Sequence, residues 1–170
     1  GRLILGVGRG NFRYEIERLG ISMEETRARF DESLAVLQAL LTREEVSWDG
    51  NYYKFDPLTI MPRPLNPGGP PMMMAAVNPE AIYHCARQGY HVQTTPLAGS
   101  KSFLQEQVDA FNRGKDEAGE TGADLTLTLL RVGFMCHSEM EKRERIQMAH
   151  AFLGRFDNVH EGDGIVDNGM

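Results

Sequence analysis

The stretch MMMAAVNPE, residues 72–80, joins the end of one strand to the beginning of one helix. Its first six residues are continuously apolar, which is typical of a strand buried on both faces of a parallel sheet. Asn78 is a favoured N-cap, Pro79 suits the first helical position, and Glu80 is an early acid that favours the N-terminal end of a helix. The stretch therefore predicts one β/α unit, whose helix ends at Gly89.

The same order of strand and helix occurs on both sides of this stretch. The other predicted strands are 3–7, 90–94 and a β-rich segment at 125–136, and the other predicted helices are 23–42, one capped by Ser100 and one capped by Ser138. Alternating strands and helices predict a parallel sheet with right-handed crossovers. Either an open doubly wound sheet or part of a closed barrel satisfies this order.

Three other segments interrupt the alternation. Residues 46–55 predict a β-hairpin, because two β-forming runs flank Asp49-Gly50-Asn51. Residues 56–71 hold six prolines and two glycines, which excludes a helix or a central strand. Residues 114–123 are rich in Gly, Asp and Glu and predict a solvated loop. The helix at 23–42 is expected to begin with a capping box formed by Ser22 and Glu25.

The composition is that of a globular domain and excludes several classes of protein. The chain has 170 residues, of which 41% are hydrophobic and 25% charged. The net charge of −6 disfavours binding to nucleic acid. No run approaches the roughly 20 apolar residues that a membrane span requires. The two cysteines, Cys85 and Cys136, do not form a disulfide framework, which fits a reducing compartment.

Two features suggest an anion site. Gly8-Arg9-Gly10 follows the first predicted strand, but Asn11 stands where a dinucleotide-binding fingerprint needs Gly or Ala. The glycines let a ligand approach the backbone and Arg9 can contact an anion, although a tight turn with a surface arginine explains these residues equally well. The helix that begins after Asn78 offers free N–H groups to an anion at the end of a strand.

The histidines and cysteines predict no metal site. His84-Cys85 and Cys136-His137 are adjacent pairs, whereas zinc ligands come in spaced pairs. Buried structural cysteines account for this pattern better than catalytic nucleophiles do. No pair of carboxylates stands out as an acid/base couple, so no catalytic residue is assigned from the sequence.

Longer motifs occur along the chain in a fixed order. These are GRLILGVGRG at 1–10, RARFDE at 27–32, the run 48–64 that ends in IMPRP, and the segment 70–89. Together they resemble the bacterial luciferase-like family of flavin-dependent monooxygenases. The resemblance implies a (β/α)8 TIM barrel, of which this chain would supply an incomplete segment, roughly the fourth to seventh strands with a β-hairpin insertion. Residues 1–170 would then be the central part of a single barrel domain, whose N- and C-terminal parts are absent from this sequence.

The resemblance also implies a cofactor, reduced flavin mononucleotide (FMN), at the C-terminal ends of the strands. Arg9, Arg27 and N–H groups around Val77 and Asn78 would hold its phosphate, and Thr94 and Thr95 would border the isoalloxazine ring. The cofactor-binding residues implied in this way are Gly8, Arg9, Gly10, Arg27, Val77, Asn78, Ala81, Thr94 and Thr95.

This chain departs from luciferase itself at three of these positions. Luciferase has Cys where Gly8 stands, an acid where Val77 stands and Thr where Ala81 stands, and the missing Thr hydroxyl removes one phosphate contact. The usual catalytic histidine of the family comes from an early strand outside this sequence. That role is therefore not transferred to any histidine present here.

The implied activity is that of a two-component monooxygenase, which uses reduced FMN from a partner flavin reductase and dioxygen to oxygenate a small organic substrate. Two alternatives stay open: a deazaflavin-dependent oxidoreductase that transfers hydride, and a non-catalytic relative that binds flavin or assembles with a partner. The resemblance further implies a homodimer at full length, and we expect a cytoplasmic protein with no membrane partner. Because a (β/α)8 barrel takes about 250 residues, we expect this segment alone to expose strand edges and to be poorly soluble.

Overall fold

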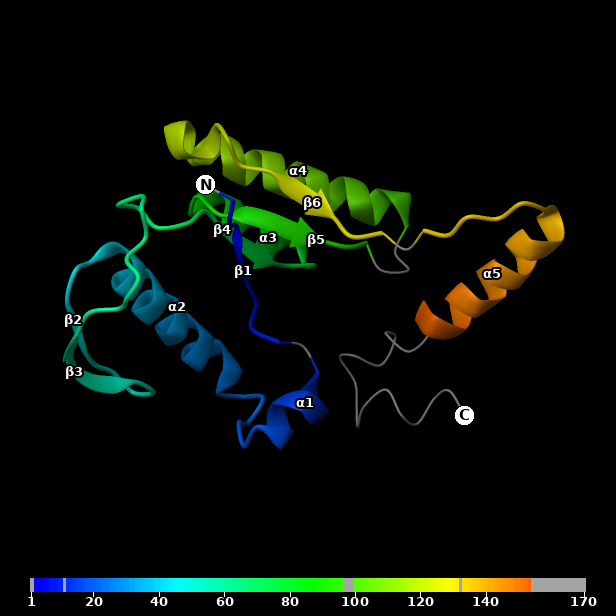
Figure 1. The fold of residues 1–170 in the computed structure, drawn as a ribbon. Coiled ribbons are helices and arrows are strands. Elements are labelled where there is room, and N and C mark those ends of the chain that lie inside the picture. Colours follow the sequence, from blue (N-terminus) through cyan, green and yellow to red (C-terminus); the bar gives the residue numbers. More distant parts are fainter. Residues whose placement is uncertain (1, 11, 97–99, 132, 154–170) are drawn as a thin grey trace.

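The computed structural model describes residues 2–10, 12–96, 100–131 and 133–153. Its centre is a four-stranded parallel sheet in the order β1-β4-β5-β6 (Figure 1). The strands are β1 (Leu5–Val7), β4 (Met72–Ala75), β5 (His91–Thr94) and β6 (Leu127–Leu129). All three pairings are parallel, so every strand ends at the same edge of the sheet.

Two helices cover one face of this sheet and form the core with it. They are α3 (Pro79–Arg87) and α4 (Lys101–Glu117), and a 3-10 turn, Gly119–Gly122, follows them. The core cluster consists of Ile82, Ala86, Val92, Ala110, Phe111 and Leu125. α3 and α4 approach closely at Gly114, where an added Cβ would lie 2.9 Å from the Cβ of Ala86. These two β/α units are therefore the best-packed part of the described chain.

The opposite face of the sheet is open among the described residues. Ala75, Gln93 and Thr128 are paired across β4, β5 and β6 and are all exposed. Side chains alternate along a strand, so Met74, Val92 and Thr94 lie on the helix-covered face and are buried. In a closed barrel the open face is the one that points inward.

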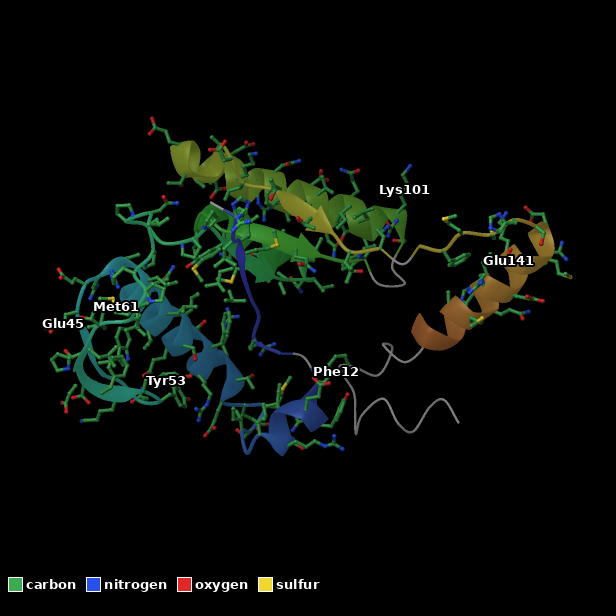
Figure 2. All side chains as sticks on the ribbon, in the orientation of Figure 1. Phe12, Glu45, Tyr53, Met61, Lys101 and Glu141 are labelled. Carbon is green, nitrogen blue, oxygen red and sulfur yellow. The ribbon has the colours of Figure 1, made fainter. Side chains whose placement is uncertain are left out.

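α2 (Thr26–Thr42) carries a β-hairpin on its surface. The hairpin strands β2 (Val46–Asp49) and β3 (Lys54–Leu58) are antiparallel. Glu32 of α2 accepts hydrogen bonds from the hairpin, including one of 3.0 Å from the N–H of Tyr53. Figure 2 shows Tyr53 at the hairpin. Gln38 of α2 donates a 2.6 Å bond to the hydroxyl of Tyr90, which follows α3. The helix thereby links the hairpin to the sheet domain.

The last described helix, α5 (Glu139–Leu153), lies apart from the sheet beyond an extended segment (Figure 1). The N–H of Glu141 donates a 3.1 Å bond to the Ser138 hydroxyl, so the predicted cap is confirmed. Ile146 of this helix is 39% exposed. Residues 154–170 lie outside the described residues.

The predicted fold class is confirmed, with parallel strands alternating with helices, but several boundaries were wrong. A short helix, α1 (Arg13–Arg18), lies between the strand predicted at 3–7 and the helix predicted at 23–42, where no helix was predicted. The long helix begins at Thr26, not at 23: the N–H of Glu25 does bond the Ser22 hydroxyl at 3.3 Å, but this bond closes a turn before the helix.

The segments 114–123 and 125–136 were also predicted wrongly in part. α4 continues through Gly114 to Glu117, because the small residue allows contact with α3. Among the described residues of the β-rich segment, only Leu127–Leu129 pairs as a strand. The hairpin prediction is confirmed, and Pro57 sits in β3, which is paired on one side only. Across the described residues, no helix is both long and apolar enough to cross a membrane.

Candidate functional site

The residues expected at the cofactor site gather at the edge where the parallel strands end. Gly8, Arg9 and Gly10 follow β1, Val77 and Asn78 follow β4, and Thr95 follows β5. β1, β4 and β5 are neighbours in the sheet. The topology thus brings together residues that are distant in the sequence.

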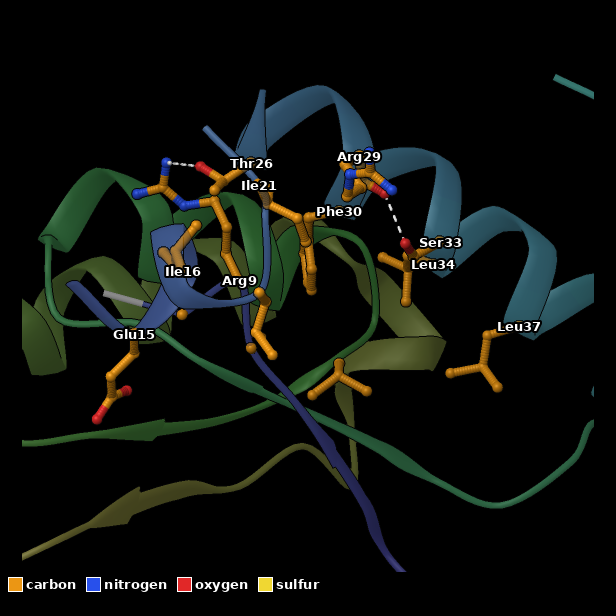
Figure 3. A pocket seen from close by; sticks show the side chains of 14 residues that line it. Arg9, Glu15, Ile16, Ile21, Thr26, Arg29, Phe30, Ser33, Leu34 and Leu37 are labelled. Atoms are coloured by element: carbon orange, nitrogen blue, oxygen red, sulfur yellow. Dashed lines mark hydrogen bonds between the residues drawn. The ribbon is translucent and has the colours of Figure 1, made fainter. Parts of the chain in front are cut away.

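Arg9 is held at the beginning of α2. Its Nη1 donates to the hydroxyl of Thr26 at 3.4 Å, and that hydroxyl donates to the carbonyl oxygen of Met23 at 2.7 Å (Figure 3). Thr26 is only 5% exposed, so it is a fixed anchor for an otherwise exposed arginine. Gly10 adopts a φ of 84°, a left-handed conformation that suits glycine, as the chain turns away from β1.

Arg27 lies next to Thr26 and carries a second positive charge. Its side chain is 73% exposed and its Nε lies 3.4 Å from a carboxylate oxygen of Asp31. This charge affects a residue of α3. Burial raises the pKa of the Cys85 thiol, and the positive charge of Arg27 acts to lower the same pKa. Ala81 lies one turn before Cys85 in that helix. The positive charge of Arg27 therefore acts on a group in the second half of α3.

The N-terminus of α3 is formed as predicted. Asn78 Oδ1 accepts a 2.9 Å hydrogen bond from the N–H of Glu80, and Pro79 occupies the first helical turn. The partial positive charge of this end suits an anion. Arg9, Arg27 and the α3 N-terminus together make the strand-end edge a region suited to a dianion.

Thr94 and Thr95 are placed differently. Thr94 is 2% exposed and lies on the same face as Val92, so its side chain belongs to the core next to the helices. Its hydroxyl has no hydrogen-bond partner among the described residues. Thr95 lies just beyond the strand and is half-buried, and its carbonyl oxygen accepts a bond from Gln107.

A cavity of about 460 Å³ adjoins Arg9 (Figure 3). It lies between the end of β1, α1 and α2, and its walls are mainly apolar, with Ile16, Phe30 and Leu34 among them. Arg9 and Thr26 form a polar end. The cavity borders the outer edge of β1, the end strand of the sheet. Its apolar wall is a face of α2 that the described residues leave uncovered.

Arg29 adds a further cation beside this cavity. Its guanidinium carbon lies 4.6 Å from the centre of the Tyr52 ring, and its buried Nε has no partner among the described residues. This cation–π contact ties Arg29 to the hairpin. Arg29 is therefore better placed to hold α2 against the hairpin than to bind the phosphate.

The described residues contain no group of three or more His, Cys, Asp or Glu side chains that could hold a metal ion. His84 lies 3.2 Å from Glu80 on the surface of α3. His91 Nδ1 accepts a 3.2 Å hydrogen bond from the backbone N–H of Thr126. Cys136 is exposed. None of these side chains forms a nucleophile–base pair, so no catalytic residue is assigned.

Sequence reasoning missed Gln107, which touches two of the strand ends. It is fully buried in α4, and its Nε2 donates to the carbonyl oxygens of Val77 at 2.7 Å and Thr95 at 3.2 Å. The sequence does contain a pattern that could have indicated this residue. Gln107 shares the apolar face of the helix with Leu104 and Phe111, and a polar residue on such a face needs buried hydrogen-bond partners.

The sequence model of the luciferase-like monooxygenase family matches residues 1–168 of this chain. The chain belongs to the luciferase-like monooxygenase family. Members of this family are (β/α)8 barrels, and the parallel β/α units described above are part of that fold. The predicted family and fold class are thereby confirmed.

Two curated relatives differ in cofactor. The chain is 35% identical over 132 residues to the F420-dependent glucose-6-phosphate dehydrogenase of Beutenbergia cavernae, covering 76% of this chain and 38% of the relative. It is 25% identical over 175 residues to the oxygenase component of the flavin-dependent trigonelline monooxygenase of Acinetobacter baylyi, covering 100% and 47%. The chain therefore spans less than half the length of these relatives.

A solved structure of a monooxygenase, RslO1 from Streptomyces bottropensis, superposes with a TM-score of 0.71 at 28% identity. The match covers 94% of this chain and 51% of that one. Relatives of this luciferase-like chain are thus oxidoreductases that use a flavin or a deazaflavin.

The residues present fit a phosphate-bearing flavin. Guanidinium groups and a helix N-terminus are the donors that a phosphate prefers, and Arg9, Arg27 and α3 supply them. The open face beside them has space: a Cβ added at Gly6 meets nothing within 4 Å, and Ala75 is small. A flat ring system can therefore approach the sheet close to the phosphate donors.

Proposed function

We propose that this chain carries the phosphate-binding part of a two-component flavin-dependent monooxygenase, which uses reduced FMN and dioxygen to oxygenate a small organic substrate. The observation that carries the proposal is that the edge where the parallel strands end holds both Arg9, which is bonded to Thr26 next to Arg27, and the capped N-terminus of α3. The monooxygenase relatives support it, because they match nearly the whole chain.

In this proposal the phosphate lies between the two guanidinium groups and the N–H groups that follow Val77, with Gly8, Gly10 and Ala81 close by. The ring lies on the open face near Ala75, Gln93 and Thr95, while buried Thr94 supports this edge from the helix side. The reduced flavin supplies the chemistry that activates dioxygen, and the protein orients it and excludes water.

The second candidate is a deazaflavin-dependent oxidoreductase that transfers hydride without oxygen. It is favoured by the 35% identity to a relative named as F420-dependent. A deazaflavin coenzyme also carries a phosphate, so the same donors serve it. The anion site alone does not separate the two cofactors.

Titration of the full-length protein with reduced FMN and with reduced deazaflavin coenzyme, under anaerobic conditions, separates them. Tighter binding of FMN, together with oxygen consumption that yields an oxygenated product, supports the monooxygenase. Tighter binding of the deazaflavin supports hydride transfer instead. Binding of neither cofactor contradicts both and favours a non-catalytic relative.

The proposal includes a partner and an architecture. A relative is named as an oxygenase component, and we accordingly propose that a flavin reductase delivers the reduced cofactor. We also propose that residues 1–170 form the central part of one barrel domain that is dimeric and cytoplasmic in the full-length protein. Sedimentation of the full-length protein tests the dimer.

A further inference from the structure

Gln107 is a polar side chain in the interior of the domain. It is 0% exposed, and it lies in α4 three residues before Ala110 and four before Phe111, the core residues of that helix. Burying an amide without hydrogen bonds costs on the order of 1–3 kcal/mol. An apolar residue of the same size would fill this position at lower cost. The presence of an amide here therefore indicates that its hydrogen bonds serve a purpose.

Both N–H groups of the Gln107 amide are used, and they go to two different strand ends. Nε2 donates to the carbonyl oxygen of Val77 at 2.7 Å and to that of Thr95 at 3.2 Å. Val77 lies two residues beyond β4, and Thr95 lies one residue beyond β5. Gln107 therefore bridges two neighbouring strands from the helix layer.

The bridge stands just past the point where the backbone pairing ends. The N–H of Ala76 donates to the carbonyl oxygen of Gln93 at 3.0 Å, which extends the pairing one step beyond β4. After that step the chain from β4 enters α3 and the chain from β5 continues to Pro96, which is buried and has no N–H. The Gln107 amide supplies the two donors that hold the diverging chains.

The bond to Val77 also fixes the direction of the next N–H group. The carbonyl of Val77 and the N–H of Asn78 belong to one planar trans peptide, so they point in opposite directions. Gln107 lies on the helix-covered side and draws the carbonyl toward α4. The N–H of Asn78 is thereby directed away from the helix layer, at the N-terminus of α3.

We propose that Gln107 is a positioning residue for the phosphate end of the cofactor site. By holding the Val77–Asn78 peptide and the Thr95 carbonyl, it fixes the N–H groups of the α3 N-terminus relative to Arg9 and Arg27. This inference rests on the proposed function. It goes further because it assigns phosphate recognition to a residue that does not touch the ligand.

The test compares FMN with riboflavin, which lacks the phosphate, in the full-length protein. Gln107→Met keeps the length of the side chain and removes both donors. We expect it to weaken binding of reduced FMN about tenfold or more, the loss associated with charge-assisted hydrogen bonds, and to leave binding of reduced riboflavin within about threefold. The ratio of the two affinities is the readout, since a merely structural role does not move it.

Three further variants keep the outcome decisive. Phe111→Leu in the same helix loses core packing but no strand-end bond, so it lowers Tm and leaves the affinity ratio unchanged. Gln107→Asn keeps an amide but shortens the side chain, so its donors fall short of the two carbonyl oxygens; it serves if Gln107→Met does not fold and should lower the ratio as well. Exposed Gln105, which bonds Asp109 at 2.9 Å, gives a neutral control as Gln105→Met.

Two results overturn the inference in distinguishable ways. If the unmodified protein binds FMN more tightly than riboflavin, and a folded Gln107→Met variant keeps the same ratio, the positioning role is wrong while the proposed function stands. If the unmodified protein binds neither flavin nor deazaflavin, the proposed function fails and this role fails with it. When the deazaflavin coenzyme is the tighter ligand, the same comparison is made with its phosphate-free form.

Discussion

The indole Nε1 of Trp48 donates a 3.1 Å hydrogen bond to a carboxylate oxygen of Glu32. The same carboxylate accepts backbone N–H groups from Asn51, Tyr52 and Tyr53. One side chain of α2 thus binds the turn and one strand of the hairpin. The hairpin is held to the domain by this acceptor, because a two-stranded hairpin alone is marginally stable in water.

Glu32→Gln is therefore expected to lower the Tm of the protein by several degrees at pH 7, since an amide donates where this site requires an acceptor. Glu44→Gln, on the exposed segment after α2, should leave Tm unchanged. Thermal unfolding followed by circular dichroism measures both. Equal Tm values for the two variants would show that the carboxylate does not hold the hairpin.

The contribution of Glu32 depends on pH with a defined sign. Desolvation acts to raise its pKa, but the hydrogen bonds from Tyr53, Tyr52, Trp48 and Asn51 together outweigh it and lower the pKa below the ordinary 4.5. A lowered pKa in the folded state means stabilisation above pH 4.5 that is lost as the pH falls through the lowered value. The Tm gap between wild type and Glu32→Gln should accordingly narrow between pH 6 and pH 3.

The sequence allowed some of these features to be predicted because their causes are local. The cap at Asn78, the hairpin turn at 49–51 and the alternation of strands and helices each depend on neighbouring residues. The short helix α1 was missed because its Phe12 N-cap makes no side-chain capping bond and only Ile16 is buried in it. Its position depends on packing rather than on a local signal.

Other features depend on contacts between distant residues. Gly114 resembles a helix breaker in the sequence, yet it is a helix residue pressed against α3. Gln107 resembles a polar interruption, yet its partners are 30 and 12 residues away. Thr94 and Thr95 look equivalent in sequence, but strand alternation buries the side chain of one in the core. The family resemblance indicated both threonines as site residues. Only the fold shows that the side chain of Thr94 lies in the core while Thr95 lies beyond the strand.

Gly114→Ala should destabilise the protein even though alanine normally favours a helix. The added Cβ would collide with the carbonyl oxygen of Tyr83 and lie 2.9 Å from the Cβ of Ala86 and 3.1 Å from the backbone nitrogen of Arg87. Overpacking of this kind costs about 1–3 kcal/mol. Chemical denaturation measures it, with exposed Asn112→Ala in the same helix as the control. A stabilising Gly114→Ala would contradict the close approach of α3 and α4.

Asn78→Ala and Ser100→Ala form a matched pair of cap variants. Asn78 Oδ1 accepts from Glu80 at 2.9 Å and Ser100 Oγ accepts from Phe103 at 3.2 Å, so each change should cost about 1 kcal/mol of stability. Only Asn78→Ala should also weaken binding of FMN, because only its helix begins at the proposed phosphate site. Weaker FMN binding in both variants, measured by anaerobic titration, would trace the effect to stability alone.

The two cysteines should react with iodoacetamide at different rates. Cys136 is exposed, whereas Cys85 is half-buried and burial raises the pKa of its thiol, which Arg27 partly offsets. Cys136 should therefore be alkylated first, and Arg27→Gln should slow Cys85 several-fold further. Mass spectrometry of labelled peptides measures the rates, with exposed Arg43→Gln at the other end of α2 as the control. Faster labelling of Cys85 in Arg27→Gln would contradict the electrostatic effect of Arg27 on this thiol.

Arg9→Ala tests the phosphate site directly. If the guanidinium contacts the phosphate, the change should weaken binding of reduced FMN about tenfold or more, the value of a charge-assisted hydrogen bond. Binding of reduced riboflavin should be nearly unaffected. Arg9→Lys keeps the charge but not the planar fork, so it should recover part of the loss. Thr26→Val removes the 3.4 Å anchor and the hydroxyl's bond to Met23 but leaves the guanidinium in place, so it should have a smaller effect than either. Equal weakening of FMN and riboflavin by Arg9→Ala would place this arginine away from the phosphate, and the site would have to rest on Arg27 and the α3 N-terminus.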